Sequence, residues 1–127
     1  MAEEEQSRFL PERAAIDAYG NGGFRFGGMS HRGSLLCLPS GMHAWPVGDF
    51  GALNLAAFDK VIAEAGEIGH LLVGTGSTIR PLPPALLERL KAAGVNAEPM
   101  STGNAARTYN ILLGENRKVA AALIAVA

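Results

Sequence analysis

Residues 70–113 read HLLVGTGSTIRPLPPALLERLKAAGVNAEPMSTGNAARTYNILL, and this stretch decides the fold. It opens with an apolar run that is typical of a buried strand. Pro83-Pro84 then suits the first turn of a helix, because proline fits that position without losing a hydrogen bond. Residues 95–98 predict a second short strand, and Ser101-Thr102 can cap a further helix. Strands that alternate with helices in this way predict a partly parallel sheet.

The segment before this stretch has the pattern of another helix. Asn54 is a good N-cap, and Leu53 and Phe58 have the spacing of a hydrophobic staple. An apolar stripe follows, and Gly66 suits the end of a helix. We therefore predict a helix from Asn54 to Gly66.

The first part of the chain is rich in short strand patterns. Residues 14–19, 24–26 and 34–38 each favour a strand, and residues 43–47 suggest another. The glycine cluster at residues 20–23 permits positive φ and suits a turn.

The end of the chain, residues 119–126, fits two structures. Its alanine content favours a helix. The break at Gly114-Glu115-Asn116 and the shortness of the run favour a buried strand, which is the interpretation we adopt.

Together these patterns predict an α/β fold, a single compact layered domain with a mixed, partly parallel sheet, about three helices and a β-rich N-terminal part. The chain of 127 residues has the size of one ordinary domain. We expect residues 1–12 to form a loose acidic tail and residues 13–127 to form the domain.

The composition is that of a globular protein, with 48% hydrophobic and 18% charged residues. A net charge of −1 argues against a nucleic-acid partner, because binding phosphates requires a basic surface. No stretch reaches the roughly 20 apolar residues of a membrane span, so we expect at most peripheral membrane association. The acidic start lacks the features of a signal or transit peptide, which makes the cytoplasm the expected location. The alanine- and glycine-rich composition suits a bacterial protein.

The residue types of common catalytic and metal sites show no informative spacing. Cys37 lies in an apolar run and is interpreted as a small core residue rather than a nucleophile. His31, His43 and His70 lack the spacing of metal ligands, so we expect no metal and no cofactor. No serine, histidine and carboxylate stand out as a triad, and we expect no catalytic residues.

The helix that begins near Thr102 separates its apolar and polar side chains. A projection at about 3.6 residues per turn places one set on a common face that should pack on the sheet. Arg107 points to the opposite side, Thr108 flanks it, and Asn110 lies at the edge of the buried stripe. The residues expected to face the sheet are Ala105, Ala106, Tyr109, Leu112 and Leu113.

A candidate binding site lies where this helix begins. A helix N-terminus and the amides of a glycine turn can both hold an anion, although a plain tight turn is the simpler account of Gly74-Thr75-Gly76. Glu98 has two interpretations: it satisfies the helix N-terminus or pairs with Arg107, or it faces a ligand. The predicted ligand- or partner-binding residues are Gly74, Thr75, Gly76, Glu98, Met100, Thr102, Arg107, Thr108 and Asn110.

Residues 98–112, EPMSTGNAARTYNIL, followed by Glu115-Asn116-Arg117, resemble a known family. It contains mitochondrial complex I (NADH:ubiquinone oxidoreductase) assembly factor 3, an adipogenesis-associated mammalian protein, and mostly uncharacterised small bacterial and archaeal domains. The resemblance covers about residues 14–125. Its earlier landmarks are Ile16-Asp17-Ala18-Tyr19-Gly20, Gly33-Ser34-Leu35-Leu36, Trp45 and Leu72-Val73-Gly74-Thr75-Gly76.

The resemblance implies a compact α/β fold in one domain, and it supports a strand at residues 119–124. It implies no known enzymatic activity. The mitochondrial relatives act with other factors in assembling the respiratory NADH dehydrogenase at the inner membrane. Because this sequence lacks a transit peptide, that role does not transfer directly. Gly103 and Asn104 depart from the family pattern, which puts the start of the last helix in question.

Two functions of different kinds follow. The first is a non-catalytic binding or assembly module linked to a respiratory membrane complex, with respiratory-complex or other assembly proteins as partners. The alternative is a protein or enzyme that binds a small anionic ligand between the Gly74-Thr75-Gly76 turn and the helix near Thr102, where Arg107 suits an anion. A third interpretation is structural, in which these polar residues only tie the helix to the sheet.

Overall fold

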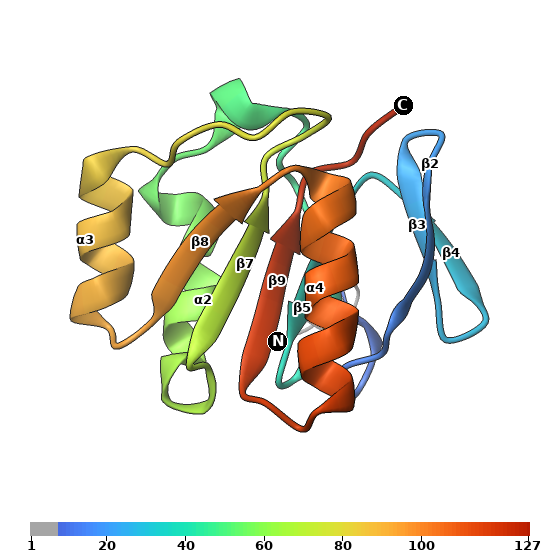
Figure 1. Cartoon of the computed structure of the whole chain (residues 1–127), viewed down its shortest axis with the longest axis horizontal. Helices are drawn as coiled ribbons and strands as arrows, with labels where there is room; N and C mark the ends of the chain where they lie inside the picture. Colours follow the sequence, from blue (N-terminus) through green and yellow to red (C-terminus); the bar gives the residue numbers. More distant parts are fainter. Residues whose placement is uncertain (1–7) are drawn as a thin grey trace.

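The computed structural model describes residues 8–127, which are built around a six-stranded sheet (Figure 1). In spatial order its strands are β1 (Arg8–Leu10), β6 (Gly41–Trp45), β5 (Ser34–Leu38), β9 (Val119–Leu123), β7 (His70–Gly74) and β8 (Asn96–Met100). β7 is parallel to both β8 and β9, whereas the other neighbouring pairs are antiparallel. The prediction of a mixed, partly parallel sheet is confirmed.

A smaller antiparallel sheet lies beside the main one. Its strands are β2 (Ile16–Gly20), β3 (Gly23–Phe26) and β4 (Met29–Arg32). The turn between β2 and β3 has positive φ at Gly20, Asn21 and Gly22, a conformation that glycine adopts without strain. The turn predicted at residues 20–23 and the β-rich N-terminal part are confirmed.

Two apolar layers cover opposite faces of the six-stranded sheet. One contains α4 (Thr102–Gly114), which packs against β7 and β9, together with the smaller sheet, which Figure 1 shows on the far side of α4 from β7. The other contains α3 (Pro84–Ala92), α2 (Asp59–Ala63) and the 3-10 turns η1 (Phe50–Ala52), η2 (Leu55–Phe58) and η3 (Ala65–Glu67). The predicted layered α/β fold with about three helices is confirmed.

Small side chains let α4 approach β9 closely. Ala121 of β9 and Ala105 and Ala106 of α4 are buried in the same layer. Tyr109 fills the space beside them, and its hydroxyl donates a hydrogen bond to Ala14 O at 2.9 Å. The apolar face predicted for this helix is confirmed, and so is the strand at the end of the chain.

The segment predicted as one helix from Asn54 to Gly66 consists of three shorter elements. Asn54 caps the first of them as predicted, because its side chain accepts a hydrogen bond from Ala57 N at 2.9 Å. However, η2, a five-residue α2 and η3 replace the continuous helix. Trp45 Nε1 donates to Ala57 O at 2.8 Å, and this bond competes with the regular pattern of an α-helix. The prediction of one helix is wrong for this reason.

Residues 8–10, expected in the loose tail, form β1 at the edge of the six-stranded sheet. Leu10 stands opposite Met42 in β6, and the Phe9 ring lies 6.0 Å from the Phe26 ring. Apolar contacts therefore hold this strand on the domain. The predicted boundary at residue 12 is wrong for residues 8–10, and the rest of the predicted tail, residues 1–7, lies outside the described residues.

The α-helices are short. α4 has 13 residues, α3 has 9 and α2 has 5. At about 1.5 Å of rise per residue, α4 extends over roughly 20 Å. Within residues 8–127, no helix has the length and apolar character needed to cross a membrane.

Candidate functional site

The chain leaves the sheet in two directions at the carboxyl ends of β7 and β8. The segment after β7 leads to α3 in one layer, and the segment after β8 leads into α4 in the other. In open α/β sheets such a divergence creates a crevice that commonly holds a ligand. Here it contains a hollow of about 830 Å³. Side chains that line it include Tyr19, Asp49, Phe50, Thr75, Ser77, Arg80, Ser101 and Arg107.

The Gly74-Thr75-Gly76 turn contributes to this lining, but its hydroxyl is committed within the protein. Thr75 is buried, and its Oγ1 is a donor to Thr78 O at 2.8 Å and to Met100 O at 3.0 Å. The same oxygen accepts a hydrogen bond from Arg80 N at 3.0 Å. Thr75 therefore shapes the loop. The backbone amides of the turn are also committed within the protein, since Thr75 N donates to Met100 O at 2.8 Å and Gly76 N donates to Thr102 Oγ1 at 3.1 Å.

Thr102 is sealed beneath the start of α4. Its fully buried hydroxyl donates to Ile124 O at 2.7 Å and accepts from Gly76 N at 3.1 Å. A Cβ on Gly74 would lie only 2.9 Å from Thr102 Cα, which explains the glycine at this crossing. The prediction that Thr102 faces a ligand is wrong, because its hydroxyl joins the β7 turn, α4 and the end of β9.

Glu98 pairs with His70 rather than with Arg107. Glu98 Oε1 lies 3.4 Å from His70 Nε2, and both side chains are partly exposed. The parallel register sets Glu98 of β8 opposite Leu72 of β7. His70 lies two residues before Leu72, and side chains two residues apart in a strand point to the same face, so Glu98 and His70 lie on the same face of the sheet. The interpretation that Glu98 pairs with Arg107 is wrong, because strand geometry gives it another partner.

Asn110 binds the backbone of β2. Its Oδ1 accepts from Ile16 N at 2.8 Å, and its Nδ2 donates to Ile16 O at 2.9 Å. These two bonds hold the smaller sheet against α4. Contrary to the prediction, the Asn110 amide is therefore committed to the fold, and Glu98, Arg107 and Asn110 do not share a cleft.

Arg107 projects from the outer side of α4, as its position in the helix predicts. It is exposed and donates a hydrogen bond to Asn104 Oδ1, one turn earlier, at 2.7 Å. It lines the main hollow, while Met100 and Thr108 line a neighbouring one of about 570 Å³ together with Asn104 and Ile79. These predicted residues therefore lie near one another around α4.

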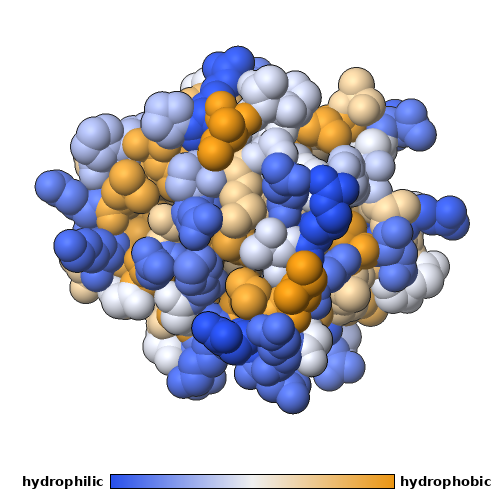
Figure 2. Space-filling view, in the orientation of Figure 1, coloured by the Kyte–Doolittle hydropathy of each residue, from blue (hydrophilic) through white to orange (hydrophobic). Residues whose placement is uncertain are grey.

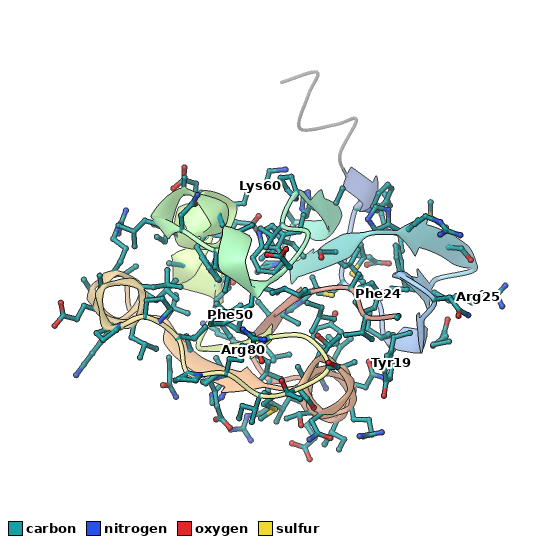
Figure 3. The ribbon with its side chains drawn as sticks, turned by 90° about the horizontal axis from the view of Figure 1, so that it is seen from above. Tyr19, Phe24, Arg25, Phe50, Lys60 and Arg80 are labelled. Carbon is teal, nitrogen blue, oxygen red and sulfur yellow. The ribbon has the colours of Figure 1, made fainter. Side chains whose placement is uncertain are left out.

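The sequence-based site omitted most residues of the main hollow, among them Arg80, Phe50 and Tyr19. The Arg80 guanidinium lies 5.5 Å from the centre of the Phe50 ring, a cation–π contact that Figure 3 shows from above. Tyr19 reaches α4 from β2, and a Cβ on Gly103 would collide with its hydroxyl. α4 begins at Thr102 in spite of the departure from the family pattern. Arg80 could have been found from its closeness to the glycine turn, whereas Phe50 and Tyr19 come from distant segments.

Potential metal ligands are dispersed over the described residues. Within residues 8–127, no three His, Cys, Asp or Glu side chains gather as a metal site would require. Cys37 is buried, and burial raises the pKa of its thiol well above the ordinary value. The interpretation of Cys37 as a core residue is confirmed.

A serine, a histidine and a carboxylate do meet at the turn between β5 and β6. Ser40 Oγ lies 2.7 Å from His43 Nε2 and donates to Glu64 Oε2 at 2.6 Å. Ser40 N also donates to Glu64 Oε1 at 2.8 Å. The hydroxyl lies between the two other groups, whereas in a hydrolytic triad the imidazole takes that place. We interpret this contact as a link between the turn and the segment after α2.

A second large hollow, of about 840 Å³, lies away from the predicted residues. It opens between η2 and the β5–β6 pair and is mainly apolar. Its lining includes Leu36, Ala44, Trp45, Val47, Ala56 and Ala57. Charged residues line this hollow too, namely Arg32, Asp59 and Lys60. The hollow beside β7 and α4 differs in that its lining is mainly polar, and we therefore treat it as the candidate site.

The fold and this hollow define a class, a small mixed α/β domain with a polar crevice at the carboxyl edge of its parallel strands. Residues 16–124 match the family described as "Protein of unknown function (DUF498/DUF598)", and the chain belongs to that family. The resemblance drawn from the sequence motifs is confirmed by relatives named as assembly factors.

Two relatives illustrate the range of this similarity. An uncharacterised protein of Rhodobacter capsulatus is 48% identical over 109 residues, which are 86% of this chain and 82% of that protein. NADH dehydrogenase (ubiquinone) 1 alpha subcomplex assembly factor 3 of Xenopus tropicalis is 34% identical over 109 residues. That match covers 86% of this chain but 60% of the frog protein. This chain thus corresponds to part of the assembly factor.

A solved structure agrees closely with the fold. The crystal structure of an outer membrane protein from Bartonella henselae superposes with a TM-score of 0.91 and 45% sequence identity. The match covers 94% of this chain and 100% of the other. The arrangement of sheet and helices described above is therefore shared with a protein of known structure.

Proposed function

We propose that this domain is a non-catalytic binding module that holds a protein partner during assembly of a respiratory membrane complex. The names of the frog and mouse relatives, which are 34% and 33% identical, support this role. Their alignments span 86% and 94% of this chain, so the similarity involves the whole domain. We further propose that it works from the cytoplasm, with at most peripheral contact to the membrane.

The partner docks on the outer side of α4, which we call the α4 face. This face is made up of Ile79, Met100, Asn104, Arg107, Thr108 and Ile111. The observation that carries the proposal is the exposure of two isoleucines at its two ends, since Ile111 is 61% and Ile79 is 63% exposed. Ile79 lines a hollow together with Asn104 and Thr108 of α4, and Ile111 lies one turn after Thr108 on the same helix. Apolar groups around an arginine are typical of the energetic centre of a protein interface.

The character of this side of the molecule also supports a protein partner. On the side that carries α4, apolar side chains lie among polar ones instead of forming one large patch (Figure 2). Such a surface suits a partner that binds and dissociates, since permanent interfaces are more apolar. Arg107 favours a partner with a carboxylate opposite it.

Co-purification from the membranes of the source cells tests this proposal. Tagged protein is expected to recover subunits or assembly proteins of a respiratory complex after mild solubilisation. Ile111→Asp should reduce that recovery by about tenfold, because it places a charge in the apolar part of the interface. Leu55→Asp is the matched control, since Leu55 is 48% exposed on η2 in the opposite layer.

Two results would count against the proposal. One is recovery of no respiratory-complex protein by the unchanged chain. The other is equal recovery by Ile111→Asp and Leu55→Asp, which would remove the α4 face from the interaction.

A further inference from the structure

The hollow at the carboxyl edge of β7 and β8 brings together two cations from separate parts of the chain. Arg80 belongs to the loop between β7 and α3, and Arg107 belongs to α4. Both line the same hollow of about 830 Å³. The divergence of α3 and α4 into opposite layers creates this space, so it follows from the topology of the whole sheet.

Within the described part of the chain, Arg80 is held in place by contacts other than a carboxylate. Its backbone N–H donates to Thr75 Oγ1 at 3.0 Å, which fixes the loop, and its guanidinium lies 5.5 Å from the centre of the Phe50 ring. Figure 3, which views the molecule from above, shows Arg80 beside Phe50 near the middle of the picture. The aromatic ring leaves the N–H groups of the guanidinium available to a ligand.

Among residues 8–127, Arg107 likewise has no acidic partner. It donates to the neutral amide of Asn104 at 2.7 Å. Among the described residues the ion pairs are His70–Glu98 and Arg117–Glu115, and neither includes Arg80 or Arg107.

Asp49 is the acidic side chain found in the lining of this hollow. Its Oδ1 accepts a hydrogen bond from Ala52 N at 3.1 Å and so caps η1. Ala127, whose terminal carboxylate is a second negative group, also lines the hollow. Neither Asp49 nor this carboxylate forms an ion pair with Arg80 or Arg107 among the described residues. Hydroxyl groups of Tyr19, Ser77 and Ser101 add further polar contacts around the same space.

We propose that this hollow is a binding site for a small molecule that carries a carboxylate or a phosphate group, and that Arg80 and Arg107 bind this group. Guanidinium groups bind both kinds of anion through paired hydrogen bonds. The proposal extends beyond the proposed function. Arg107 belongs both to the α4 face and to the hollow, so the test uses the isolated domain, in which no protein partner engages Arg107.

A titration followed by proton–nitrogen correlation spectra of the isolated protein tests this site. The probes are inorganic phosphate and succinate, each compared with sodium chloride at the same ionic strength. We expect saturable shifts of the Gly76, Ser77 and Gly103 amides with at least one probe. A response to phosphate alone or to succinate alone distinguishes the two ligand chemistries.

Variants decide whether the arginines carry the binding. The double variant Arg80→Gln/Arg107→Gln should weaken binding at least about tenfold, because each loses charge-assisted hydrogen bonds. Arg89→Gln, an equal loss of charge at an exposed position of α3, should bind as the unchanged protein does. If the double variant lacks a folded spectrum, the single variants Arg80→Lys and Arg107→Lys replace it, and each should weaken binding because lysine lacks the fork of donors.

The proposal is overturned if the amide shifts grow linearly with the concentration of phosphate and succinate and if sodium chloride produces the same shifts. It is also overturned if the folded arginine variants bind phosphate and succinate as tightly as Arg89→Gln does.

Discussion

At the scale of single residues, Asn110 joins two elements that are far apart in the chain. Its side-chain amide binds both the N–H and the C=O of Ile16, at 2.8 and 2.9 Å. Ile16 is buried at the start of β2, so water would replace these bonds poorly. The contact is one way in which the smaller sheet is held on α4.

Asn110→Ala should therefore destabilise the protein by about 1–3 kcal/mol, because it leaves a partly buried donor and acceptor unsatisfied. Urea unfolding measures the change. Asn104→Ala is the control on the same helix, since Asn104 is exposed and contacts Arg107, and it should change stability by less than about 0.5 kcal/mol. Equal effects of the two substitutions would contradict the structural role of Asn110.

Cys37 and Tyr109 are a second residue-scale feature, since burial favours their neutral forms. Desolvation raises the pKa of the Cys37 thiol and the pKa of the Tyr109 hydroxyl, and their mutual contact raises that of Tyr109 further. In the unfolded chain the thiol ionises near pH ~8.5 and the phenol near pH ~10. The stabilising contribution of each group is therefore complete below these values and is lost as pH rises above them.

We predict that the free energy of unfolding falls above pH ~8.5, with a slope of about 1.4 kcal/mol per pH unit from the thiol alone. In Cys37→Ala the slope of the free energy of unfolding against pH should be smaller by that amount between pH ~8.5 and ~10. Near pH ~10 the free energy of unfolding should begin to fall more steeply, because Tyr109 ionises in the unfolded chain. Urea unfolding at a series of pH values measures both slopes. Identical slopes for the two proteins in this interval would refute the assignment to Cys37.

At the scale of elements, Thr102 connects the parts that form the crevice. Its hydroxyl joins the turn after β7 to α4 and to Ile124, just beyond β9. A valine would fill the same volume without these hydrogen bonds. The position of α4 over β7 therefore depends on one buried hydroxyl as well as on apolar contacts.

Thr102→Val should lower stability by about 1–3 kcal/mol, since Gly76 N and Ile124 O lose a partner. Thr102→Ser keeps the hydroxyl and should retain both hydrogen bonds. Hydrogen exchange of the Gly76 amide gives a local readout, and it should accelerate in the valine variant and stay slow in the serine variant. Equally slow exchange in both would show that the hydroxyl does not hold the turn.

The elements that the sequence predicted correctly are those set by local patterns. The Asn54 cap, the turn at residues 20–23 and the apolar side of α4 are local patterns, and each is confirmed. β1 was missed because Arg8–Leu10 is very short and depends on pairing with β6, far along the chain. The helix predicted from Asn54 was wrong because Trp45, on another strand, binds its backbone.

The sequence predicted where the candidate site lies, but it predicted only some of the residues that form it. The outward direction of Arg107 follows from helical periodicity and is confirmed. The partners of Glu98 and Asn110 depend on strand register and on the approach of β2, which no local pattern records. Arg80 and Phe50 come together through tertiary packing for the same reason.

At the scale of the whole molecule, the two layers on the six-stranded sheet give the domain two different sides. One carries α4 with its exposed Ile111, and the other consists of α3 and the short helices around residues 50–67. The crevice opens where these layers diverge. A protein partner on the α4 face would therefore lie next to the hollow proposed for the anion.

Photo-crosslinking in living cells tests the central claim, that the α4 face binds a protein of a respiratory complex. A photoreactive amino acid replaces Ile111 in one variant and Leu55 in another, and the crosslinked proteins are identified by mass spectrometry. The account predicts that position 111 captures a subunit or assembly protein of a respiratory complex and that position 55 does not. Capture of such a protein from both positions alike, or from neither, would contradict it.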